Sequence, residues 1–243
     1  MHAADLAADL VAAWEQGCGR TPVGRGESLL GALGIDAARR WDLSVGQRDT
    51  LLMDLRARLF GTGVTALAAC PACREQLEVT FDLDDVRTHP PGDPTDPVEV
   101  VQDGYTVYAR PPTAGDLVAL DVALPWPDAC EQLLERCVLG ARLAGRQVPV
   151  AELPDVVRDR LETRLAEADP QADVQVVLTC PDCGRTWSAL FDVVSFLWEE
   201  LDVWARSLVV EVHDLASVYG WSEADILGMS PYRRSLYLDQ VRR

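Results

Sequence analysis

Two stretches of this chain follow one pattern: residues 70–82 are CPACREQLEVTFD, and residues 180–192 are CPDCGRTWSALFD. In each stretch, Cys-Pro-x-Cys is followed by seven residues and then by Phe-Asp. After each Cys-Pro-x-Cys, apolar residues alternate with polar ones at a period of two, which is typical of a strand. Each stretch is therefore predicted to form the turn and second strand of a β-hairpin, with two cysteines at the turn.

The cysteines of these two turns form a predicted metal site. Thiolates are soft ligands, and four of them make the tetrahedral set that zinc favours. Four protein ligands leave no open coordination position, so such an ion has a structural role. The sequence thus predicts one structural zinc ion, bound by Cys70, Cys73, Cys180 and Cys183.

Other uses of paired cysteines stay open at this point. A Cys-Pro-x-Cys pair also occurs in glutaredoxin-like redox sites, but there it opens a helix inside a βαβ unit, whereas here a period-two strand follows. Disulfides would require export, and residues 1–17 have no basic start followed by an apolar run, so no signal peptide is expected. Ligand type alone does not separate zinc from iron. We therefore expect a cytoplasmic protein with a four-cysteine metal site.

The two cysteine pairs lie far apart in the chain. Residues 74–179, 106 in all, separate them, whereas a compact zinc ribbon has roughly 15–20 residues at this place. The intervening part is therefore an insertion, and zinc would join its start to its end. We expect an α+β fold, mostly helical, with a split zinc ribbon made of two CPxC hairpins and an inserted hairpin-plus-helices segment. The expected regions are 1–62 (N-terminal helices), 63–88 (first zinc-ribbon hairpin), 89–172 (inserted β-hairpin and helices), 173–192 (second zinc-ribbon hairpin) and 193–243 (C-terminal helices).

Local signals predict further elements outside the two hairpins. Ser44 is expected to cap a helix that ends at Gly61. Asp103-Gly104, between two runs of β-branched and aromatic residues, predicts the inserted hairpin. The proline-rich stretch from His89 to Pro97 predicts an exposed linker before it.

A helical pattern follows the inserted hairpin. Apolar residues at helical spacing predict a helix from Asp128 to Ala144. Cys130 and Cys137 lie seven residues apart on one face of that helix, and we expect both to be small core residues and not ligands.

Composition and charge restrict the possible partners. The chain of 243 residues is 48% apolar and 25% charged, as in ordinary globular proteins. Its net charge of -17 repels phosphate backbones and anionic lipid headgroups, so nucleic acid is not expected as a partner. The chain also has no stretch of about 18 consecutive apolar residues, so no membrane insertion is expected.

Sequence motifs of catalysis are missing. The chain has no Gly-rich phosphate loop, no HExxH and no GxSxG. We therefore expect a protein that is not an enzyme and takes no small-molecule substrate. A hydrolase with an unrecognised site is a competing interpretation, which would require a concave pocket with converging polar groups.

Aromatic and arginine residues gather near the end of the chain. Both residue types are frequent anchors of protein interfaces. In the alternative interpretation, Trp221 and Tyr237 only pack the last two helices onto the rest of the protein. The candidate partner-binding residues are Trp221, Tyr232, Arg233, Arg234 and Tyr237.

A series of segments along the chain resembles one known family. In order, the segments are Trp14-Glu15, LSVGQRDTLLMDLRARLFG at 43–61, the first CPxC hairpin, YTVYARPPTAGDL at 105–117, the second CPxC hairpin, and YGWSEADILGMSPYRRSLYL at 219–238. Together they resemble the T-even phage-type baseplate hub assembly chaperone family. Its members occur in gene clusters for contractile phage tails and for tail-like contractile injection systems. The cysteine pairs are the sharpest feature of the resemblance and make this chain more similar to the injection-system branch.

The resemblance implies a function by binding. It implies an assembly chaperone or minor component of the baseplate hub, with other baseplate or hub proteins as partners. Such a protein would be found in the cytoplasm or incorporated into an assembled tail-like particle. The hypothesis is that zinc fixes the two hairpins, the hairpins orient the helices, and the C-terminal helices dock onto another baseplate protein. The alternative is a zinc-ribbon regulatory protein that binds other cytoplasmic proteins such as the transcription machinery.

Overall fold

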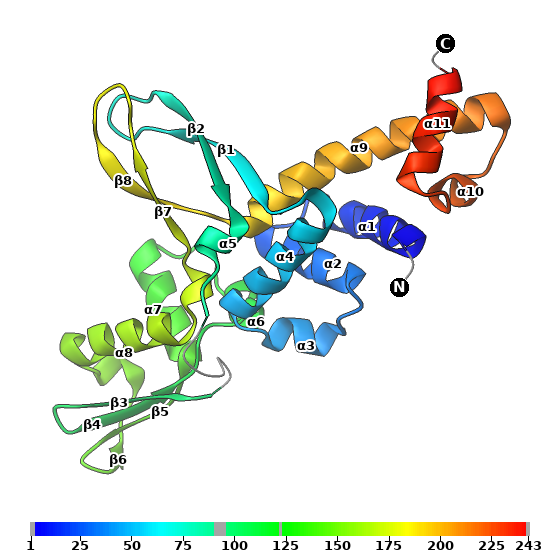
Figure 1. Ribbon diagram of the computed structural model, residues 1–243. Coiled ribbons are helices and arrows are strands. Elements are labelled where there is room, and N and C mark those ends of the chain that lie inside the picture. The colour runs from blue at the N-terminus through cyan, green and yellow to red at the C-terminus, as the bar shows by residue number, and fades with distance from the viewer. Residues whose placement is uncertain (1–2, 90–95, 122, 242–243) are drawn as a thin grey trace. The chain divides into compact units, whose positions relative to one another are not determined.

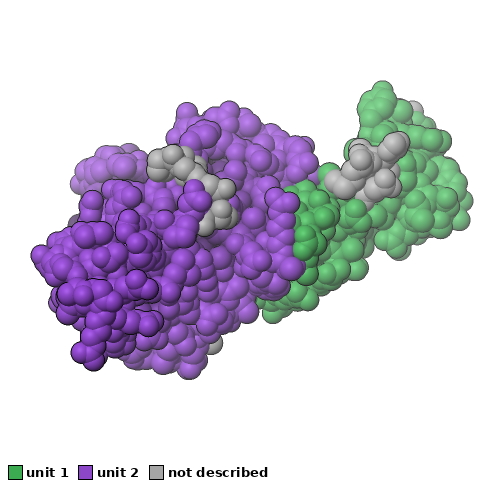
Figure 2. Space-filling view, turned by 90° about the horizontal axis from the view of Figure 1, so that it is seen from below, with its two compact units in different colours: residues 1–37, 194–243 green, residues 38–193 purple. Residues whose placement is uncertain are grey.

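The computed structural model describes residues 3–89, 96–121 and 123–241 of the chain. The chain divides into two compact units, one of residues 1–37 and 194–243 and the other of residues 38–193 (Figure 2). Most of the predicted linker from His89 to Pro97 lies outside the described residues.

Two β-hairpins in the unit of residues 38–193 carry the cysteine pairs. Strand β1 (Gly63–Ala69) pairs antiparallel with β2 (Gln76–Asp82), and β7 (Gln175–Thr179) pairs in the same way with β8 (Thr186–Leu190). More buried and more exposed side chains alternate along most of each strand, as the period of two predicts. Figure 1 shows the two hairpins with their turns at the same end.

Helix α4 (Val45–Phe60) leads into the first hairpin. The Ser44 hydroxyl accepts a hydrogen bond from the Gln47 amide at 3.2 Å, and the Gln47 side chain accepts one from the Ser44 amide at 3.0 Å. This reciprocal capping box begins the helix. Gly61 follows the last turn with a φ of 86°, so both predicted ends of the helix are confirmed. Two short helices flank α4 and the first hairpin: α3 (Ala37–Asp42) and α5 (Leu83–Val86).

The insertion between the hairpins folds around a four-stranded antiparallel sheet in the order β3-β4-β5-β6. Helices α7 and α8 pack against one face of this sheet, and apolar side chains from both layers form its core. The buried core residues are Val98, Val100, Val107, Ala109, Leu134, Ala141, Leu153, Val157 and Leu161. The elements are β3 (Val98–Gln102), β4 (Tyr105–Ala109), α6 (Ala114–Val118), α7 (Trp126–Cys137), β5 (Val138–Leu143), β6 (Arg146–Gln147), η1 (Val150–Glu152), α8 (Asp155–Ala168) and η2 (Pro170–Ala172).

The predicted helix from Asp128 to Ala144 is wrong in its second half. Helix α7 ends at Cys137, and the next six residues form strand β5, which pairs with β4. Ala141 is buried as expected, but in the sheet, where it lies opposite Val107. Cys137 is also buried, whereas Cys130 is exposed on α7 and is not a core residue.

The unit of residues 1–37 and 194–243 is helical. The indole Nε1 of Trp14 donates a hydrogen bond to Asp202 Oδ1 at 2.9 Å, which joins the first helix to the long one. Leu215, Ile226 and Leu238 form a second buried cluster that joins the last three helices. Among the described residues, no helix combines the length and the apolar character needed to cross a membrane. The helices are α1 (Ala3–Gly17), α2 (Pro22–Ala32), α9 (Val193–Tyr219, which begins one residue before this unit), α10 (Glu223–Leu227) and α11 (Pro231–Val241).

Candidate metal centre

The two hairpin turns bring all four predicted ligands together. The Sγ atoms of Cys70 and Cys183 lie 3.7 Å apart, and those of Cys73 and Cys180 lie 3.5 Å apart. All four sulfur atoms are within 4.8 Å of one another. These two contacts cross from one hairpin to the other, although residues 74–179 separate the two pairs in the sequence.

The spacing of the sulfur atoms fits one metal ion better than disulfide bonds. A disulfide requires a sulfur–sulfur distance of about 2.05 Å, and the cysteines are all free. Around a tetrahedral ion with metal–sulfur bonds of about 2.3 Å, neighbouring sulfur atoms lie about 3.8 Å apart. The two cross-hairpin distances are close to this value, so the donor set can hold one ion without rearrangement of the backbone.

The two turns have the same backbone geometry. In the first, the amide of Cys70 donates to the Glu75 carbonyl, and the amide of Arg74 donates to the Cys70 carbonyl. In the second, Cys180 donates to Arg185, and Gly184 donates to Cys180. These hydrogen bonds curl each turn around the first sulfur of its pair, which is the shape of a metal knuckle.

The first and second cysteines of each pair differ in burial. Cys70 and Cys180 are each 1% exposed, whereas Cys73 and Cys183 lie at the surface. Four ligands of one kind around one centre leave no coordination position for a substrate. The arrangement can therefore cross-link two hairpins, and it lacks the open position that metal catalysis requires.

Backbone amides and neighbouring thiols shift the pKa values of the cysteines unequally. The amide of Cys73 is the main cause that lowers the pKa of the Cys70 thiol to about 6. The amide of Glu75 lowers the pKa of Cys73, but burial and the neighbouring thiols outweigh it and raise that pKa to about 12. Ionisation of one thiol in the cluster therefore makes ionisation of the next thiol less favourable. A bound cation would let all four thiols ionise together, with release of their protons.

Contacts at the base of the hairpins hold the same two chain segments together. The Phe81 and Phe191 rings meet edge to face, with centroids 5.1 Å apart. The buried Gln171 Oε1 accepts hydrogen bonds from the Thr88 amide at 2.7 Å and from the Thr88 hydroxyl at 3.2 Å. The two phenylalanines occupy the same place in the repeated stretches, but neither their contact nor the Gln171 contact was predicted from the sequence.

The five candidate partner-binding residues have different environments. Trp221 stacks on Tyr219 with ring centroids 4.5 Å apart and meets Tyr237 edge to face at 4.8 Å. Both Trp221 and Tyr237 pack against the buried cluster of the last three helices. Tyr232 is 74% exposed and Arg233 is exposed, with its guanidinium 5.9 Å from the Tyr237 ring centroid.

Arg234 has a role inside the protein. Its side chain is buried, its Nε lies 3.2 Å from Glu211 Oε2, and its guanidinium donates to the Met229 carbonyl at 2.9 Å. Since Glu211 lies on α9, this ion pair holds α11 onto α9. No local signal predicted this ion pair, because its partners are 23 residues apart and on different helices.

Fold and cluster together define an α+β protein with a four-cysteine site able to hold one metal ion. Residues 30–198 match the family model described as T4 bacteriophage base plate protein. This match covers more than half of the chain, and the chain belongs to that family. The family resemblance seen in the sequence is thereby confirmed. No curated protein and no solved structure matches the chain.

Proposed function

We propose that this protein is a non-enzymatic, zinc-stabilised assembly chaperone or minor component of the baseplate hub of a contractile tail or contractile injection system. The observation that carries the proposal is the match of residues 30–198 to a base plate protein family. This family membership supports a structural role with other baseplate or hub proteins as partners. The net charge of -17 is the reason to expect no nucleic-acid partner. It also favours this function over that of a zinc-ribbon regulator of transcription.

In this proposal, zinc completes a split ribbon. The four sulfur atoms supply a closed set of soft ligands, which favours zinc with a structural role. An ion at this place links chain segments that are separated by residues 74–179. By chain entropy alone, a link that closes a loop of that length stabilises the fold by roughly 4–5 kcal/mol. The ion thus keeps both ends of the insertion in place while the protein engages its partner.

The exposed part of α11 is the proposed docking surface. Tyr232 and Leu236 lie four residues apart on one face of the helix and are 74% and 48% exposed. Arg233 lies beside them and is exposed. We call Tyr232, Arg233 and Leu236 the α11 surface. Trp221, Arg234 and Tyr237 support this surface from behind, by packing α11 against α9 and α10.

The test is particle assembly in cells that produce the contractile particle. A Tyr232→Ala and Leu236→Asp double variant removes the aromatic anchor and places a charge in the contact. We expect assembled particles, counted by electron microscopy, to fall at least roughly tenfold, while the melting temperature of the purified protein stays unchanged. A Val203→Asp variant on α9 serves as the control, since this apolar side chain is 70% exposed and lies on another helix. Normal particle numbers in the first variant would refute this docking surface.

A further inference from the structure

The outer face of the inserted sheet, opposite its core, carries exposed apolar side chains among its polar ones. An antiparallel sheet that faces water on one side normally carries polar residues there. Here Val101 is 69% exposed, Leu139 is 56% exposed and Tyr108 is 41% exposed. The register of β4 and β5 shifts between Tyr108 and Ala109, close to where Leu139 emerges on β5.

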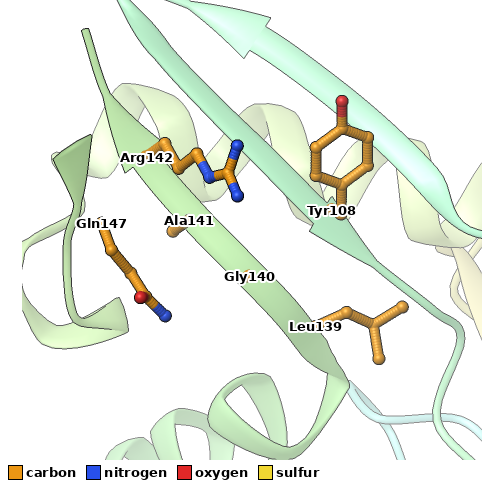
Figure 3. A pocket seen from close by; sticks show the side chains of 6 residues that line it. All are labelled: Tyr108, Leu139, Gly140, Ala141, Arg142 and Gln147. Atoms are coloured by element: carbon orange, nitrogen blue, oxygen red, sulfur yellow. The ribbon is translucent and has the colours of Figure 1, made fainter. Parts of the chain in front are cut away.

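A hollow lies in this face above Gly140. In the register of the sheet, Gly140 is opposite Tyr108, and no atom lies within 4 Å of the position that a Cβ would take. The Tyr108 hydroxyl donates to Glu99 Oε1 at 2.6 Å, which holds the ring toward β3 and away from Gly140. A glycine inside a strand often marks a β-bulge or a place where a ligand or another backbone approaches closely, and Gly140 lies beside the register shift of β4 and β5. The hollow has a volume of about 250 Å³ and is lined by Tyr108, Leu139, Gly140, Ala141, Arg142 and Gln147 (Figure 3).

One side of the hollow carries a free positive charge. Arg142 and Gln147 lie opposite each other on β5 and β6, and both are exposed. Within the described ranges, the side chain of Arg142 has no ion pair and no hydrogen bond, although its backbone pairs within the sheet. By contrast, Arg110 and Arg136 both contact the buried carboxylate of Asp116, at 2.5 and 3.3 Å. The planar guanidinium of Arg142 thus has its donors available for a carboxylate from outside the chain.

We propose that this outer face is a second docking surface, for a segment of a partner protein that carries Asp or Glu next to an aliphatic residue. The aliphatic side chain enters the hollow above Gly140, and the carboxylate pairs with Arg142. The shallow form of the hollow argues for a protein segment, because a small-molecule site encloses most of its ligand. This inference goes beyond the proposed function, since it uses neither the cysteines nor the α11 surface.

The key variant is Gly140→Thr, which fills the hollow without disturbing the fold. The Cβ has free space at this position, and β-branched residues favour strands, so the melting temperature should stay equal or rise. Arg142→Gln removes the charge. Arg146→Gln is its control, because Arg146 precedes Gln147, the residue opposite Arg142, and its side chain therefore points to the other face of the sheet.

The probe is a library of short random peptides, selected on the complete wild-type protein after depletion on Gly140→Thr. We expect the recovered peptides to carry Asp or Glu beside Leu, Ile or Val. Their affinity should fall at least roughly tenfold with Arg142→Gln, the loss expected for a charged hydrogen bond, and stay unchanged with Arg146→Gln. Failure to recover peptides, recovery of peptides without acids, or binding that is insensitive to Arg142 would overturn the proposal. Dimerisation of the wild-type protein that is lost in Gly140→Thr would assign the face to a second copy, and would overturn it too.

Discussion

Arg74 and Gly184 occupy the same position in the two cysteine turns, one residue after the second cysteine. Both have a left-handed backbone, with φ values of 64° and 70°. This conformation suits glycine but strains a residue with a Cβ. The first turn therefore carries a local strain that the second avoids.

Arg74→Gly is predicted to stabilise the protein. Relief of the left-handed strain exceeds the added backbone entropy of the unfolded chain, so the free energy of unfolding should rise by roughly 0.5–1 kcal/mol. Urea unfolding of the metal-loaded protein would measure it. Ala72→Gly in the same turn is the control, since Ala72 has an ordinary φ and glycine there should only destabilise. A loss of stability with Arg74→Gly would mean that the arginine side chain has a role of its own.

Asp49 is a second residue with a testable environment. Burial raises the pKa of its carboxyl to about 6, even though Arg48 lies 2.7 Å away and opposes the shift. Asp192 and Asp169 add to the rise through their negative charges. The folded protein therefore keeps the Asp49 proton between about pH 4 and pH 6, where the unfolded chain has lost it.

The pH dependence follows from this difference. Because the folded state binds more protons in that window, the free energy of unfolding falls as pH rises through it, by up to roughly 3 kcal/mol from Asp49. In Asp49→Asn, the loss of stability between about pH 5 and about pH 7.5 should be smaller than in the wild type by part of this amount. Burial also raises the pKa of Asp169, so some dependence should remain. Urea unfolding at both pH values tests this, and equal slopes for the two proteins would contradict it.

For single residues, the role could be predicted from the sequence where a repeated motif contains the residue. The role could not be predicted where it depends on a partner far away in the chain. Cys70 and Cys180 could be paired because each opens the same Cys-Pro-x-Cys pattern. Arg234 was predicted as a contact residue because of its type, but its environment depends on Glu211, which lies on another helix. The residue type alone therefore does not show whether a charged side chain is buried when the residue that neutralises its charge is far away in the sequence.

At the scale of elements, the start of α4 is packed tightly against η2. The amide of Gly46 donates to Asp169 Oδ2 at 2.9 Å. A Cβ on Gly46 would lie 2.1 Å from Asp169 Oδ1 and 2.9 Å from the Ala172 backbone nitrogen. Since η2 precedes the second hairpin and α4 precedes the first, this contact helps to align the two hairpins.

Gly46→Ala is predicted to destabilise the protein by roughly 1–3 kcal/mol, because the added methyl group forces η2 away from α4. Thermal and urea unfolding would measure the change. Gly63→Ala is the matched control at the start of β1, where no atom lies within 4 Å of a new Cβ, and it should be nearly neutral. Equal effects of the two variants would show that α4 and η2 can separate without cost.

Element boundaries were predicted well where a cap marks them and poorly where the chain changes structure without one. Ser44 and Gly61 mark both ends of α4, and both were predicted from local sequence. At the end of α7, Cys137 is followed directly by Val138 of β5 without a glycine or proline between them. The helical spacing continues to Ala141, and only pairing with the distant strand β4 makes this part a strand.

At the scale of the whole molecule, the two ends of the insertion are held together at several levels. The cysteine turns meet at one end of the hairpins, the Phe81 and Phe191 rings meet at the other, and Gln171 hydrogen-bonds with Thr88 beyond them. The repeat in the sequence predicted the cysteine cluster and the insertion. It could not predict the Gln171 contact or the four-stranded sheet, because both depend on pairings between residues far apart in the chain.

The most direct test is the metal content of the purified protein by elemental mass spectrometry, with melting curves for the wild type and a Cys70→Ser and Cys180→Ser double variant. We predict one zinc ion per chain in the wild type and none in the variant. The melting temperature of the variant should be lower by roughly 10 °C or more, because the link across the insertion is lost. A metal-free wild-type protein with four titratable thiols in the cluster, and the same melting temperature in both proteins, would contradict the structural zinc site.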